Sequence, residues 1–359
     1  MNMRLGRRSF GLLVAVGLAA SSAIAADKVS ELFNQANALA TQRSWDAAIT
    51  QYKEVVRLSP AFPEAHYNLG LALQASGDLN GAIDEYRQAI RLKPGFFEAQ
   101  NSLGQALARS GQVDTGIAEL RDLIKVKPDF ADAHYNLANA LAAKGDLDSA
   151  IASFRDALRL RPDSVPAQNN LANALRSQGK TAEAVAEYRE AIRLGSPQAY
   201  LHFNLANALA DGGKFNDAIE QYGLALKLDP NDAETHNNLA VAQAAAGNLD
   251  KAADEYRQAI KLLPGLVRAH YNLGLLLDRK GDHNAAIGEF SEAIRLQSDY
   301  AAAHFSLARA LERTGKRQAA LAHFRTSWEL DPQNANSLSE YERLLKTSKQ
   351  TAPSATPAN

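Results

Sequence analysis

Carboxamide side chains recur along this chain at a fixed step of 34 residues. One position of that step, the ladder column, holds seven asparagines, interrupted only by Ser102 and Ser306: Asn34, Asn68, Asn136, Asn170, Asn204, Asn238 and Asn272. A second column lies three residues further on, at Asn37, Asn139, Asn173 and Asn207, with Gln105 related in kind. A carboxamide offers two N–H donors and two acceptor lone pairs, which match the donor and acceptor of a peptide unit. A row of carboxamides is therefore suited to holding an extended polypeptide by its backbone.

These asparagines need a specific reason, because asparagine is a mediocre helix former. One explanation is that they bind a peptide. The other is that each amide bonds to backbone or to a neighbouring helix and so orders the repeats, since buried amides must be satisfied in either case. We favour peptide binding and keep repeat ordering as the alternative.

An aromatic column stands directly beside the ladder column. It contains Phe33, Tyr67, Tyr135, Phe203, Tyr271 and Phe305, alternating with Asn101, Asn169 and Asn237. Exposed rings can clasp apolar side chains of a bound segment, as they do in peptide-binding grooves. Packing of the rings against the next unit is an equally good explanation.

Six of the eight histidines form a further column: His66, His134, His202, His236, His270 and His304. Metal ligands must converge within about 2 Å of one ion, whereas neighbouring helices lie ~8–10 Å apart. We therefore predict a structural role for this column and no metal site.

The same 34-residue step predicts the elements that carry these columns. Glycine follows it at Gly77, Gly111, Gly145, Gly179, Gly213, Gly247, Gly281 and Gly315. A fixed period of this length indicates one supersecondary unit copied in series. In residues 131–164, apolar residues at three- and four-residue steps predict a helix that ends at Gly145 and a second helix that stops before Pro162.

Nine such units begin at Val29, Pro63, Phe97, Ala131, Val165, Ala199, Ala233, Val267 and Ala301, so the repeats cover residues 29–334. We expect an all-α protein, an α-solenoid of about nine 34-residue helix-turn-helix repeats in which each unit packs on its neighbours. A helix over residues 335–346 is expected to cap the last unit. The polar residues 347–359 are expected to be disordered. The first unit has Arg43 where the other units have glycine, which leaves the sharpness of that turn open.

The pattern of Leu, Gly or Ala, and Leu on the first helix, then Gly, Ala, Tyr or Phe, Ala and Pro, resembles the tetratricopeptide repeat. This resemblance implies a right-handed superhelix whose first helices line its concave surface. The segment HYNLANAL at residues 134–141 is most similar to the repeats of the O-linked N-acetylglucosamine transferases, in which an asparagine ladder binds substrate peptides. The similarity implies the same use for the ladder column here. The catalytic domain of those transferases is missing from this sequence.

Residues 1–25 have the layout of a secretory signal peptide. Three arginines precede an apolar run over residues 10–20, and Ala23-Ile24-Ala25 precedes the expected cleavage before Ala26. The adjacent Arg7 and Arg8 partly resemble a twin-arginine export signal. We predict a periplasmic or secreted bacterial protein without an integral membrane span in its mature chain. The alternative is an uncleaved inner-membrane anchor.

Composition narrows the functional classes. A formal net charge of −1 argues against nucleic acid as a partner, and the absence of cysteine excludes disulfides and zinc–thiolate sites. No phosphate-binding loop, nucleophile motif or metalloprotease motif occurs, so we expect neither an enzyme nor a cofactor. The column of Tyr67 contains no lysine, so the version of the repeat that grips acidic chaperone C-termini is not expected.

Two functions remain. The first is an exported scaffold that binds an extended peptide or protein segment in its groove, through the ladder column, the second column, and Tyr67, Tyr135, Phe203 and Tyr271. The alternative is an accessory factor for extracellular polysaccharide synthesis or export, with a polysaccharide-export machine as partner. In that case aromatic contacts to glycan or to a partner enzyme would matter more than the amides.

Overall fold

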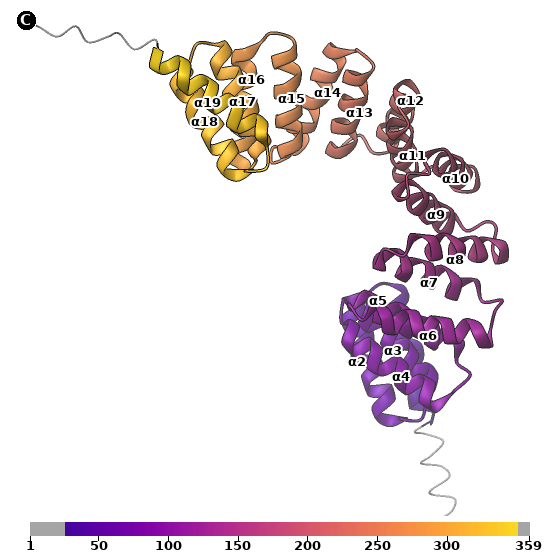
Figure 1. Ribbon diagram of the computed structural model, residues 1–359. Coiled ribbons are helices and arrows are strands. Elements are labelled where there is room, and N and C mark those ends of the chain that lie inside the picture. The colour runs from indigo at the N-terminus through magenta and orange to yellow at the C-terminus, as the bar shows by residue number, and fades with distance from the viewer. Residues whose placement is uncertain (1–25, 351–359) are drawn as a thin grey trace, which may run out of the picture. The chain divides into compact units, whose positions relative to one another are not determined.

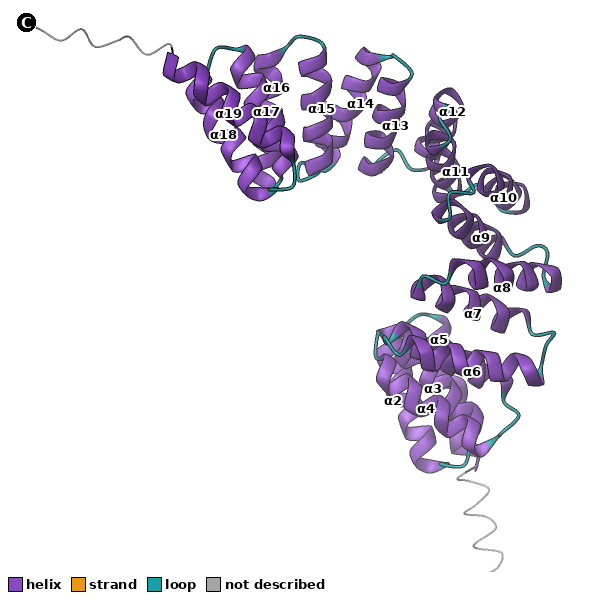
Figure 2. Ribbon diagram, viewed as in Figure 1, coloured by secondary structure: helices purple, strands orange, loops and turns teal. Residues whose placement is uncertain are grey.

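A computed structural model describes residues 26–350, except for the side chains of residues 348–350. The predicted signal peptide, residues 1–25, and residues 351–359 of the predicted tail lie outside the described part. The chain divides into two compact units at Gly179 and Lys180. All regular structure in residues 26–350 is helical, with no strand (Figure 2).

The first unit contains the first four repeats and the first helix of the fifth repeat. A helix over residues 26–41 comes first. It is followed by α2 (Trp45–Leu58), α3 (Pro63–Ser76), α4 (Leu79–Leu92), α5 (Phe97–Arg109), α6 (Val113–Val126), α7 (Ala131–Lys144), α8 (Leu147–Leu160) and α9 (Val165–Ser177). Each helix packs on the next one along the chain (Figure 1).

The second unit begins with the second helix of the fifth repeat. It contains α10 (Thr181–Leu194), α11 (Ala199–Asp211), α12 (Phe215–Leu228), α13 (Ala233–Ala245), α14 (Leu249–Leu262), α15 (Val267–Arg279), α16 (His283–Leu296), α17 (Ala301–Arg313), α18 (Arg317–Leu330) and α19 (Ala335–Gln350). The all-α repeat fold expected from the 34-residue step is confirmed.

The turn between the two helices of a repeat depends on a left-handed residue. Gly145 has φ 87°, a conformation that is inexpensive only for glycine, and the other seven glycines of its column also have positive φ. Arg43 holds the same turn in the first repeat with φ 59°. The repeat therefore keeps its turn without glycine, at a cost of about 1–2 kcal/mol for a left-handed L-residue.

Pairs of small and large side chains set how closely the two helices of a repeat approach. Phe154 of α8 is 1% exposed, and the flanking Ala150 and Ala157 are also buried. The facing first helix must offer glycine or alanine. A Cβ added to Gly274, for example, would lie only 2.6 Å from the Phe290 ring.

Helix α19 covers the last repeat. Its Leu344 is 1% exposed and belongs to the same apolar cluster as Phe324 of α18. The Ser337 hydroxyl lies 3.0 Å from the Ser327 hydroxyl, and Ser327 donates to the carbonyl of Ala301. The helix extends to Gln350, four residues beyond the expected end at Lys346.

Candidate peptide-binding surface

Within each unit, the first helices of the repeats present the ladder column and the second column side by side, and we call this surface the amide face of the unit. In full, the second column comprises Asn37, Leu71, Gln105, Asn139, Asn173, Asn207, Val241, Leu275 and Arg309. Its amide members and the ladder amides form hydrogen bonds between consecutive repeats.

The same arrangement of amides recurs in both units. Asn37 Oδ1 accepts from the Tyr52 hydroxyl at 2.6 Å and from Asn68 Nδ2 of the next repeat at 2.9 Å. In the second unit, Asn207 Oδ1 accepts from the Tyr222 hydroxyl at 2.6 Å and from Asn238 Nδ2 at 3.2 Å. A ladder amide therefore donates to the second-column amide of the preceding repeat.

Asn170 continues this pattern with additional partners. Its Nδ2 donates to Asn139 Oδ1 at 2.9 Å and to the Tyr135 hydroxyl at 3.1 Å. Its Oδ1 accepts from Asn169 Nδ2 at 3.1 Å. Both ends of this carboxamide are thus used within the first unit.

Asn136 is the most enclosed member of the ladder column, with 7% exposure. It donates to Asn101 Oδ1 at 2.9 Å and accepts from Gln105 Nε2 at 3.0 Å. Gln105 Oε1 in turn accepts from Gln74 Nε2. At its other end, Gln74 Oε1 accepts from the Tyr86 hydroxyl. Burial raises the pKa of Tyr86, so its hydroxyl stays protonated as the donor at the end of this chain.

The remaining ladder members differ in their surroundings. Asn272 donates to Asn237 Oδ1 at 3.3 Å, and Asn237 donates to Asn238 Oδ1 at 3.0 Å. Asn173 and Asn204 also have interaction partners. Asn34, in the first helix, is exposed and has no hydrogen-bond partner among the described residues.

The network assigns different orientations to the two columns. Ladder amides direct N–H donors toward a neighbouring repeat, which is what the repeat-ordering alternative requires. The second-column residues Asn37, Asn139 and Asn207 receive those bonds on Oδ1. Their Nδ2 donors have no partner within residues 26–350, and their side chains are half-buried. A peptide carbonyl could be held by these donors without breaking a bond between repeats.

The aromatic column is only half-buried, but its rings pack inside the repeats. Tyr67 lies 5.9 Å from Tyr86 and 4.9 Å from Phe96 between ring centroids. Tyr271 contacts Phe290 and Tyr300 at 5.9 and 4.9 Å. Similar pairs within one repeat join Tyr135 to Phe154 at 6.0 Å and Phe203 to Tyr222 at 6.1 Å. These geometries agree with the packing explanation, while the rings themselves remain half-buried.

The histidines are held between the helices of their own repeats. His66 Nδ1 lies 2.6 Å from Glu85 Oε2, and its Nε2 lies 3.0 Å from the carbonyl oxygen of Pro60. His236 and His270 repeat this arrangement with Glu255 and Glu289. No group of three or more potential metal ligands occurs in the described part of the chain. Such a histidine therefore links the second helix of its repeat to the loop that precedes the repeat.

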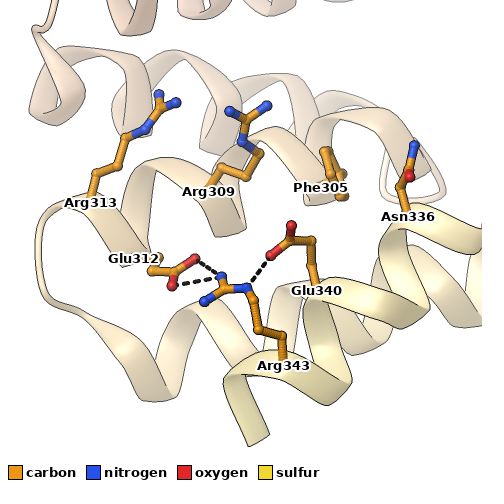
Figure 3. Close-up of a pocket in the computed structure, with 7 residues that line it drawn as sticks. All are labelled: Phe305, Arg309, Glu312, Arg313, Asn336, Glu340 and Arg343. Atoms are coloured by element: carbon orange, nitrogen blue, oxygen red, sulfur yellow. Dashed lines mark hydrogen bonds and ion pairs between the residues drawn. The ribbon is translucent and has the colours of Figure 1, made fainter. Parts of the chain in front are cut away.

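A second group of residues, overlooked in the sequence, lies at the C-terminal end of the second unit. An open pocket of about 530 Å³ lies between α17 and α19 (Figure 3). Arg343 of α19 forms two hydrogen bonds to Glu312, at 2.7 and 2.8 Å, and its Nε donates to Glu340 at 2.7 Å. These two carboxylates, Glu312 first, raise the pKa of Arg343.

Two further arginines reach this pocket from α17. Arg313 pairs with Asp278, which also accepts from His283. Burial acts to raise the pKa of Asp278, but its bonds from Arg313 and His283 outweigh that effect and lower it. Arg309 is exposed and has no ion pair among residues 26–350. The signal that could have revealed it is simple, because Arg309 continues the second column after Val241 and Leu275.

Among residues 26–350, no helix combines the length and the apolarity needed to cross a membrane.

Comparison with known proteins assigns the family. A model described as tetratricopeptide repeat matches residues 101–165, 145–199 and 268–335, and one described as TPR repeat matches residues 36–77, 74–111, 206–247 and 244–281. Together they cover most of the chain, so the protein belongs to the tetratricopeptide repeat family. They assign no particular branch of it. No curated protein matches the sequence.

A solved structure shows the same fold over most of the chain. One chain in the structure of the APC/C hetero-tetramer Cut9–Hcn1 matches over 88% of this chain and 76% of its own, at 15% identity and a TM-score of 0.53. YrrB, a TPR protein with an unusual peptide-binding site, matches over 51% of this chain and 95% of its own, at 25% identity and a TM-score of 0.45. MamA of Desulfovibrio magneticus RS-1 matches over 47% and 95%, at 23% identity and a TM-score of 0.43.

This assignment defines the class of protein. A tetratricopeptide repeat array is a scaffold of the kind that typically mediates protein–protein interaction and peptide binding, and the fold is generally non-catalytic.

Proposed function

We propose that this protein is an exported scaffold that binds an extended peptide or protein segment along its amide face. The observation that carries the proposal is the orientation of Asn37, Asn139 and Asn207, whose Oδ1 atoms are bonded within the array while their Nδ2 donors have no partner among residues 26–350. A peptide carbonyl needs such a donor. The repeats hold these donors in place through the bonds on Oδ1, so little side-chain entropy is lost on binding.

The ladder amides then serve mainly to position that row of donors. Asn136 illustrates this role, because both ends of its buried carboxamide are bonded to other side chains. Asn272 differs, since its Oδ1 has no partner among the described residues and can accept from a peptide N–H. We therefore assign the peptide contacts chiefly to the second column. Ladder residues with an unpaired atom, such as Asn272, and the aromatic column make secondary contacts.

The glycan alternative has less support. Aromatic recognition of sugar needs exposed ring faces, whereas Tyr67 and Tyr271 each pack against two other rings. Export is proposed from residues 1–25 alone, whose arginines, apolar run and Ala-x-Ala site match a signal peptide. Mass spectrometry of the protein from a bacterial host should find Ala26 at the N-terminus, and a retained Met1 would contradict cleavage.

Peptide binding is tested by selecting a random dodecapeptide phage library on immobilised residues 26–359. Selected peptides are then measured by fluorescence anisotropy against two single variants, Asn139→Asp in the first unit and Asn207→Asp in the second. Aspartate keeps the Oδ acceptor that Asn170 and Asn238 need, but it replaces the outward donor by a second oxygen. Each lost hydrogen bond is worth about 0.5–1.5 kcal/mol, so the dissociation constant should rise about two- to tenfold in the variant of the unit that binds the peptide.

The matched control is Asn216→Asp, the same chemical change on the second helix α12, which should leave binding unchanged. Failure to enrich any peptide, or the same affinity for the wild type and for both single variants, would contradict the proposed function.

A further inference from the structure

The second column changes its chemistry along the second unit. It begins with the amide of Asn207 in α11 and continues as Val241 in α13, Leu275 in α15 and Arg309 in α17. Val241 and Leu275 are 43% and 42% exposed, so the second column presents apolar side chains to solvent in two consecutive repeats. Because they cannot donate or accept hydrogen bonds, apolar side chains of a ligand are their most favourable partners.

The column ends at the pocket between α17 and α19, where one cation is uncommitted. Arg343 is bonded to Glu312 and Glu340, and Arg313 is paired with Asp278. Arg309 has no partner within the described residues, and its guanidinium points away from the Arg343 cluster (Figure 3). The pocket therefore offers one uncommitted guanidinium, directed away from the two carboxylates that Arg343 already neutralises.

A carboxylate is the ligand group that fits Arg309. The planar guanidinium presents its N–H donors in a fork that matches two carboxylate oxygens. Asn336 lines the same pocket from α19 and carries a carboxamide that can donate as well (Figure 3). Since Val241 and Leu275 contact side chains of the ligand, Arg309 in the same column is also placed to contact a side chain.

The spacing of the first helices sets the spacing of these contacts on a ligand. Consecutive first helices are close enough for Asn272 Nδ2 of α15 to reach Asn237 Oδ1 of α13 at 3.3 Å. Packed helices lie ~8–10 Å apart, and an extended chain in the polyproline II conformation advances about 3.1 Å per residue with three residues per turn, so that every third side chain points the same way. One repeat therefore corresponds to about three residues of an extended peptide.

We propose that the second unit recognises an extended peptide with two apolar side chains three residues apart, followed three residues later by aspartate or glutamate. The apolar side chains lie on Val241 and Leu275, and the carboxylate pairs with Arg309. This inference rests on the proposed function and adds to it the chemical class of the partner segment. It differs from the lysine-dependent grip on acidic C-termini, because the cation lies in the second column and the ligand carboxylate belongs to a side chain.

The test uses fluorescein-labelled, C-terminally amidated peptides and residues 26–359. The first peptide carries two leucines three residues apart and an aspartate three residues further on, in a Gly-Ser background. The second replaces the aspartate by asparagine. Anisotropy should show about tenfold tighter binding of the aspartate peptide to the wild-type protein, as expected for a charge-assisted bond.

Variants locate the interaction. Arg309→Gln should weaken binding of the aspartate peptide to the level of the asparagine peptide and leave the asparagine peptide unchanged. Leu275→Ser should weaken both peptides. Arg189→Gln removes an exposed arginine from the second helix α10 and serves as the matched control, with no change expected for either peptide.

Equal affinity for the aspartate and asparagine peptides, or an equal loss of both in Arg309→Gln, would overturn this inference. A requirement for a free C-terminal carboxylate would overturn it too. The proposed function is judged separately by the library-selected peptides and the Asn139 and Asn207 variants. If those peptides bind as expected while the designed peptides fail, only the present inference is wrong.

Discussion

The amide network makes a graded prediction for three asparagines that the sequence treats as equivalent. Asn34 has no hydrogen-bond partner among the described residues, Asn68 makes one bond to the preceding repeat, and Asn136 makes two while 7% exposed. Replacing each by alanine removes zero, one or two of these bonds. The three substitutions are chemically identical, so their differences report on the tertiary contacts.

The expected magnitudes follow from two opposing effects. Each lost hydrogen bond costs about 1 kcal/mol, and alanine gains about 0.6 kcal/mol over asparagine as a helix former. Asn34→Ala should therefore stabilise its helix by about 0.6 kcal/mol. Asn68→Ala should destabilise by about 0.4 kcal/mol and Asn136→Ala by about 1.4 kcal/mol.

Hydrogen exchange of residues 26–359, followed by mass spectrometry, measures these effects locally. Repeat arrays need not unfold in one step, so a single global transition would average them. Protection of amide hydrogens in α5 and α7 should fall about tenfold in Asn136→Ala, as 1.4 kcal/mol corresponds to a factor of ten. Adding Gln105→Ala should then cost less than it does alone, because the two residues share a bond.

The reasoning is refuted if Asn136→Ala protects α5 and α7 as well as the wild type does. In that case the bonds between repeats would contribute nothing, and the ladder would be free for a ligand along its whole length.

Three further predictions concern the scaffold. Gly274→Val should destabilise the second unit by about 1–3 kcal/mol in thermal unfolding, because its Cβ meets an aromatic ring, whereas Gly223→Val, with open space around it, should not destabilise it. Arg43→Gly should raise the stability of the first repeat by about 1 kcal/mol in urea unfolding, since it relieves a left-handed L-residue, and an unchanged midpoint would contradict the strain. Burial first, and then the charge of His304, lower the pKa of His323 below its unfolded value of about 6.5. The stability of the last repeat should therefore be complete above a pH of about 6.5 and should fall as the pH drops below it. His323→Glu recreates the histidine–glutamate pair of other repeats and should remove this acid sensitivity in melting curves at pH 5 and 7.5.

The fold could be predicted from the sequence because its determinants are local and repeated. The glycine column marks turns in which each glycine has positive φ, and the alanines and aromatics alternate as the helix pairs require. The fold was predicted less accurately where the repeat pattern is broken. Arg43 gave no signal that it would adopt the glycine conformation, and the polar sequence after Lys346 gave no sign that α19 continues to Gln350.

The candidate site was predicted only in part. The sequence identifies the asparagines and their columns, but it does not show that Asn136 is enclosed by Asn101 and Gln105 while Asn34 is exposed. It also does not single out Val241, Leu275 and Arg309, because these residues share the second column but carry no carboxamide.

By itself, then, the sequence determined the helices, their order and the columns of equivalent side chains, because a helix and its turn depend on residues within a few positions of one another. Only the tertiary structure decided which carboxamide atoms are already bonded and which remain for a ligand. Those bonds join residues such as Asn68 and Asn37, 31 positions apart, across two packed repeats. The orientation of an amide is set by the partners that reach it in space, and no pattern of spacing contains that information.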